Sequence, residues 1–72
     1  MEPNDEQLIG TLLDKDPELK RYYEEHVQLE KTLAQMNHRA HLSPDEEIER
    51  KRLQKLKLAG KDRIMEILNK YR

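Results

Sequence analysis

Three histidines are the side chains of this sequence best suited to binding a metal ion or moving a proton. His38 and His41 are three residues apart, which places two ligands on one turn of a helix. A zinc site needs further ligands, but the sequence has no cysteine and no carboxylate at a fixed spacing from this pair. We therefore interpret both as residues of a helix end and its loop, and we expect no metal and no cofactor.

His26 lies on an otherwise apolar helix face. At such a position a hydrogen-bonded histidine that fixes helix register is more common than a catalyst. The sequence also shows no grouping of Ser, His and Asp, no glycine-rich phosphate loop and no paired catalytic carboxylates. No catalytic residue is assigned, and we expect a protein that is not an enzyme and takes no small-molecule substrate.

A basic stretch within residues 50–63 is the most suggestive functional feature, because clustered bases can follow the phosphates of a nucleic acid. Its members are Arg50, Lys51, Arg52, Lys55, Lys57, Lys61 and Arg63. On a helix these charges spread around most of the circumference, and an acidic cluster lies one turn upstream. We interpret the stretch as a solvated helix face, with binding of structured RNA or DNA as the alternative.

The clearest local signal lies at Ser43, Pro44 and Glu46, which together begin a helix. Ser43 suits the cap position, Pro44 the first helical position, and Glu46 completes a capping box with Ser43. Just upstream, residues 36–40 lose their apolar period. We predict long helices over about 17–38 and 44–70, joined by a turn at 39–43 as an antiparallel hairpin.

A short helix is expected before the hairpin, at about residues 5–14. Asn4 and Gln7 have the spacing of a weaker capping box, and an apolar set follows them at helical spacing. Pro17 disfavours a helical conformation at Asp16, so the short helix should end there and the next should begin with Asp16 as its cap. Whether this break is a turn or only a kink stays open.

Both long helices carry an apolar stripe, which indicates an all-α fold with coiled-coil-like packing. The first stripe comprises Leu19, Tyr22, His26, Leu29, Leu33, Met36 and Ala40, and the second comprises Leu53, Leu56, Gly60, Ile64, Ile67 and Tyr71. Folding the chain at the turn places Tyr22 opposite Gly60. We interpret Gly60 as space for the phenol ring, so that Gly60→Leu should overpack the hairpin.

The composition bounds the size and the environment of the protein. Its 72 residues make one small domain of marginal stability. Such domains are commonly stabilised by binding a partner or a second copy of themselves. The formal net charge is −1, so no global field favours nucleic acid or membrane. An acidic start, the absence of cysteine and the lack of a long apolar run lead us to expect a cytoplasmic protein without a membrane segment.

A hairpin has one internal seam, yet the sequence carries further apolar residues. Those that we predict to contact another protein are Leu8, Ile9, Leu12, Leu13, Leu58 and Met65. Pairing of two hairpins into a four-helix homodimer would cover them, and an unidentified protein partner is also compatible. The alternative is a monomer whose short helix folds back over Ile64, Leu68 and Tyr71.

Four segments together resemble the YdcH-like family, a family of short bacterial proteins without an established activity. They are Leu13–Leu19, His26 with Leu29 and Glu30, Leu42–Ile48, and Lys57–Leu58 with Lys61, Asp62 and Ile64. The resemblance covers nearly the whole chain and implies a bacterial, cytoplasmic helical hairpin. Gly60 and Arg63 depart from the family pattern, which more often has a larger apolar residue and an acid there.

Overall fold

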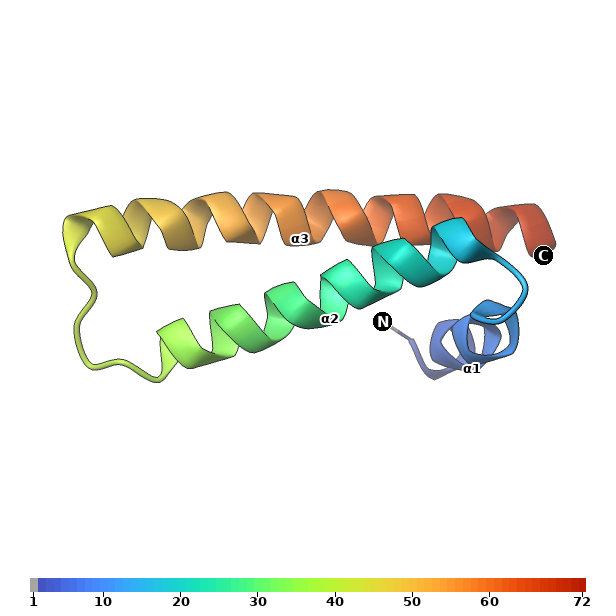
Figure 1. Ribbon diagram of the computed structural model, residues 1–72, viewed down its shortest axis with the longest axis horizontal. Coiled ribbons are helices and arrows are strands. Elements are labelled where there is room, and N and C mark those ends of the chain that lie inside the picture. Colours follow the sequence, from blue (N-terminus) through green and yellow to red (C-terminus); the bar gives the residue numbers. More distant parts are fainter. Residues whose placement is uncertain (1) are drawn as a thin grey trace.

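The computed structural model describes residues 2–72 and contains, over that range, three α-helices and no β-strand. Helix α1 covers Pro3–Leu12, α2 covers Pro17–Asn37 and α3 covers Pro44–Tyr71. The molecule is elongated, with extents of 43 × 18 × 17 Å. Helices α2 and α3 pack against each other as an antiparallel hairpin, and α1 is seen nearly end-on beside their open end (Figure 1).

The predicted start of α3 is confirmed in detail. The Ser43 hydroxyl accepts a hydrogen bond from the backbone N–H of Glu46 at 3.2 Å, and the Glu46 carboxylate accepts one from the backbone N–H of Ser43 at 3.1 Å. Hydrogen bonds to its charged form, first from the Ser43 backbone, hold the pKa of Glu46 below its ordinary value of 4.5. Glu46 also pairs with Arg39 across the loop.

Helix α1 begins and ends earlier than the predicted range of about 5–14. Its cap residue is Glu2, which makes no side-chain capping bond, so the proposed capping box of Asn4 and Gln7 is wrong. Pro3 decides the start, because its ring fixes a helical φ at a position that needs no N–H. After Leu12 the chain makes a full turn, in which the N–H groups of Lys15 and Asp16 both bond the Leu12 carbonyl at 2.9 Å.

Asp16 caps α2, as predicted, by accepting a hydrogen bond from the backbone N–H of Leu19 at 3.0 Å. Its second carboxylate oxygen accepts from the Tyr71 hydroxyl at 2.7 Å. Asp5 of α1 pairs with Arg72 just after α3. These two contacts join the first turns of α1 and α2 to the end of α3.

The main hydrophobic core lies where all three helices meet, at the open end of the hairpin. It consists of Ile9, Leu12, Leu19, Ile64, Ile67 and Leu68. Toward the loop the only other buried apolar side chains, among the residues described, are Leu33 and Leu53. In Figure 1 the axes of α2 and α3 move apart in this direction. The apolar stripes are therefore well covered at one end of the hairpin and less so at the other.

None of the helices formed by residues 2–72 combines the length and the apolar character that crossing a bilayer requires.

Candidate functional site

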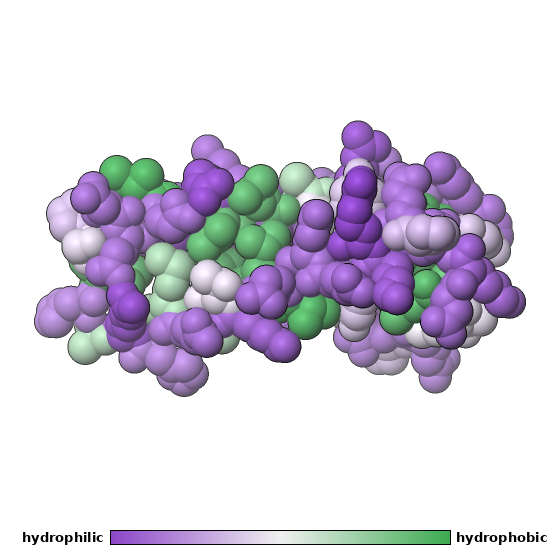
Figure 2. Space-filling view, in the orientation of Figure 1, coloured by the Kyte–Doolittle hydropathy of each residue, from purple (hydrophilic) through white to green (hydrophobic). Residues whose placement is uncertain are grey.

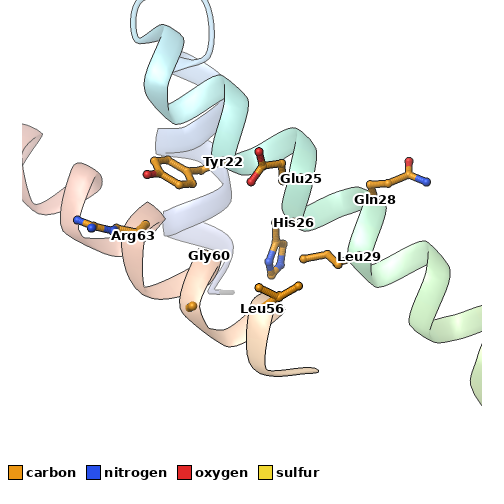
Figure 3. A pocket seen from close by; sticks show the side chains of 9 residues that line it. Tyr22, Glu25, His26, Gln28, Leu29, Leu56, Gly60 and Arg63 are labelled. Atoms are coloured by element: carbon orange, nitrogen blue, oxygen red, sulfur yellow. The ribbon is translucent and has the colours of Figure 1, made fainter. Parts of the chain in front are cut away.

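An open groove lies between α2 and α3 near the middle of the hairpin (Figure 3). Its volume is about 510 Å³, within the size range of ligand and partner pockets. Its lining residues are Tyr22, Glu25, His26, Gln28, Leu29, Leu56, Ala59, Gly60 and Arg63. Apolar side chains and Gly60 form most of the floor, whereas charged residues stand along the edges.

Helical spacing explains how these residues come to one groove. Tyr22, His26 and Leu29 follow at intervals of four and three along α2, which keeps them on one face. Leu56, Gly60 and Arg63 repeat the same intervals along α3. Because α2 and α3 are antiparallel neighbours, the two faces form opposite walls of the groove (Figure 3).

His26 is the one titratable side chain in the groove that is buried, at 6% exposed. Its Nε2 lies 2.7 Å from a carboxylate oxygen of Glu30, one turn farther along the same helix. A carboxylate only accepts, so in the neutral ring Nε2 carries the proton and Nδ1 is an acceptor. Nδ1 is buried and has no partner among the residues described. This unsatisfied acceptor is unusual in a folded protein.

The predicted contact between Gly60 and Tyr22 is corrected by the structure. Both residues line the groove, but a Cβ built on Gly60 would have no atom within 4 Å apart from the helix's own backbone. The glycine leaves a hollow that the phenol ring does not fill, and the Arg21 guanidinium lies 5.1 Å from the centre of that ring. Overpacking at Gly60 is therefore not expected within one chain.

The six residues predicted to contact another protein are divided by the structure. Ile9 and Leu12 are buried in the chain's own core, and Leu8, Leu13 and Met65 are half-buried against it. Only Leu58 is largely exposed, at 59%. The expected outward strip of Leu58 and Met65 is thus not a strip, because Met65 turns toward the core. Ile9 and Leu12 of α1 share this core with Ile64 and Leu68 of α3.

The basic stretch of α3 is partly neutralised within its own helix. Arg50 and Arg63 each lie 3.3 Å from a glutamate three residues away, Glu47 and Glu66 respectively. Arg52 makes two hydrogen bonds to Glu49, also three residues away. The ion pair with Arg52 also holds the pKa of Glu49 below its ordinary value. Lys51, Lys55 and Lys61 are exposed, and Lys57 is half-buried. The bases therefore form no single free cationic face.

A second, more polar hollow of about 410 Å³ lies beside the loop. Its walls include Thr32, Arg39, Asp45 and Glu49. Arg39 pairs with Glu46, and Glu49 pairs with Arg52, so three of the four charged side chains in its walls have partners in the chain. His38 and His41 are both exposed. No three His, Asp or Glu side chains of residues 2–72 are grouped so that they could hold a metal ion.

Comparisons with models of protein families, with curated proteins and with solved structures find no match. The resemblance to the YdcH-like family therefore stays a prediction. The groove was not predicted as a site, although its residues were assigned to the hairpin seam. The usable signals were a glycine and a histidine within two otherwise apolar stripes, at positions facing each other across the hairpin.

Proposed function

We propose that this protein is a non-enzymatic helical-hairpin module that works through helix–helix contact and associates with itself. The observation that supports it is the uneven cover of the hairpin seam. One end carries the main core, while near the groove Leu56 remains 46% exposed. On the half of the molecule nearer the loop, apolar side chains reach the surface over α3 and between α2 and α3 (Figure 2).

Self-association fits the physics of a small chain. A two-helix seam buries little apolar surface, and covering more of it with a second hairpin adds stability that the monomer lacks. Ile48, 67% exposed, adds to the apolar surface that α3 shows to solvent. The groove is a poor catalytic site by comparison, because its only buried titratable side chain already uses one nitrogen on Glu30.

Binding of structured RNA or DNA stays the weaker prediction. The pairing of Arg50, Arg52 and Arg63 with glutamates reduces the positive charge available to phosphates. Salt separates the two functions, because a phosphate-driven complex weakens steeply as salt rises whereas an apolar helix contact does not. We also propose membership of the YdcH-like family and coiled-coil-like packing, both on the sequence patterns given above.

Sedimentation equilibrium from micromolar to millimolar concentration tests the proposal. We expect the mass to rise from monomer to dimer across this range, and to do so at both low and high salt. A monomeric mass at the highest concentration would overturn self-association. Adding RNA or DNA duplexes in a parallel series tests the alternative, which predicts a complex that dissociates as salt is raised.

A further inference from the structure

We infer that the groove between α2 and α3 is filled by the same face of a second copy, which donates a hydrogen bond to Nδ1 of His26. This inference rests on the proposed self-association and assigns its interface. It replaces the interface expected from Leu58 and Met65, because Met65 packs toward the chain's own core. The occupant follows from three features of the groove: an unsatisfied acceptor, a hollow floor and edges of opposite charge.

The acceptor shows that the groove is incomplete in one chain. His26 is more than nine-tenths buried, and its ring points into the groove toward Leu56 (Figure 3). In the neutral ring, where Nε2 donates to Glu30, Nδ1 is an acceptor for which no described residue of the chain provides a donor. Nδ1 has almost no accessible surface in the single chain, so a partner that brings an N–H or O–H group to this nitrogen must also shift the side chains that cover it.

The hollow at Gly60 allows a second backbone or side chain to approach closely. An added Cβ there would meet open space, and Leu56 beside it keeps 46% of its surface exposed. Small residues in a helix face permit close packing of another helix, and the exposed leucine supplies apolar surface to bury. A helical partner therefore suits this floor.

Charge complementarity identifies the partner as a second copy. The α2 edge of the groove carries Glu25, and the α3 edge carries Arg63. A two-fold axis running along the groove places α2 of each chain over α3 of the other, so each acidic edge faces a basic edge. Among the residues described, Arg63 forms an ion pair with Glu66 alone. Because both side chains are exposed, breaking this pair costs little free energy. The result is an antiparallel four-helix arrangement.

The first test fills the groove. Gly60→Leu should weaken dimerisation by at least about tenfold in sedimentation equilibrium, because the new side chain occupies the space of the partner. Gly10→Leu is the matched control, since Gly10 also lies in a helix with open space around it but away from the groove. Circular dichroism of both variants verifies that the helices remain. A wild-type dimer that Gly60→Leu leaves unchanged would overturn the assigned interface and leave self-association standing.

The second test exchanges the charges at the two edges of the groove. Glu25→Arg and Arg63→Glu should each weaken the dimer by roughly threefold to tenfold, and the double exchange should restore it, because each new arginine then faces a new glutamate. Glu24→Arg and Lys61→Glu are the controls, since both residues are exposed and neither lines the groove. Equal losses in the controls, or no restoration in the double variant, would overturn the two-fold arrangement.

The third test concerns the acceptor. His26→Leu should weaken the dimer by about threefold or more while the denaturation midpoint of the monomer does not fall, because leucine removes an unsatisfied acceptor from the monomer and a hydrogen bond from the dimer. An unchanged dimer would overturn the hydrogen bond. Another outcome is a wild type that stays monomeric and binds an apolar dye, with dye binding lost in Gly60→Leu. That result would overturn the second copy as occupant in favour of a small amphipathic molecule.

Discussion

Ser43 shows how much a single residue determines in this protein. Its hydroxyl and the Glu46 carboxylate satisfy each other's backbone N–H groups at the start of α3. Ser43→Ala should lower the free energy of unfolding by ~0.5–2 kcal/mol, because the N–H of Glu46 then loses its acceptor. Urea titration measures the loss. Ser43→Asp keeps an acceptor and should stay near the wild type, and an unchanged midpoint in Ser43→Ala would show that α3 does not depend on this cap.

Gly60 gives a second prediction at the scale of one residue. Because a Cβ at Gly60 meets no neighbour within 4 Å, Gly60→Ala should raise the free energy of unfolding of the monomer by roughly 0.5–1 kcal/mol through better helix propensity. Gly10→Ala in α1 should behave similarly. The measurement is a denaturant titration at a concentration low enough to keep the protein monomeric. A clear loss of stability in Gly60→Ala alone would restore the interpretation that Tyr22 needs this space.

Between elements, Asp16 connects the start of α2 with the end of α3. The N–H of Leu19 and the hydroxyl of Tyr71 donate to its carboxylate and hold its pKa below the ordinary value of 3.8. The same bond raises the pKa of Tyr71 above 10.0. Tyr71 is exposed and Asp16 is only half-buried, so solvent screens the interaction and its contribution to stability is small, although its sign is defined.

The pH dependence follows from these two shifts. The folded state favours ionised Asp16, so this stabilisation is present above 3.8 and is lost as the pH falls through the lower pKa of the folded state. The folded state favours protonated Tyr71, so the stabilisation from this group is present below pH 10.0 and is lost as the pH rises through the raised pKa of Tyr71. Tyr71→Phe should remove the alkaline loss and reduce the acid one. Urea midpoints across the pH range measure both, and an identical alkaline profile in the variant would refute the link.

For the whole molecule, stability should be concentrated at the open end of the hairpin. Ile9 is 1% exposed in the core shared by the three helices, so Ile9→Ala should cost about 2–5 kcal/mol, a large share of what a domain of this size has. Leu58→Ala removes an exposed side chain and should change stability by less than about 0.5 kcal/mol. Thermal unfolding followed by circular dichroism compares them. Equal effects would mean that α1 does not dock as described.

The sequence by itself determined the local structure. The start of α3 at Ser43, the restart of α2 at Asp16 and Pro17, and the antiparallel pairing of the two long helices all follow from it. Caps, prolines and the period of apolar residues act over about four positions, so they can be interpreted without knowing the rest of the molecule. The exception is the start of α1, where Pro3 outweighed the weaker signal of Asn4.

Only the tertiary structure decided which apolar residues are covered and which remain open. An apolar stripe shows that Ile9, Met65 and Leu56 each lie on some face, but not how far apart two helix axes lie or what crosses them. Helix α1 crosses the open end, where its own Ile9 is buried and Met65 of α3 is half-buried, while the separation of α2 and α3 leaves Leu56 exposed. The unsatisfied Nδ1 of His26 depends on the same separation, because no group of the opposite helix comes close enough to donate to it.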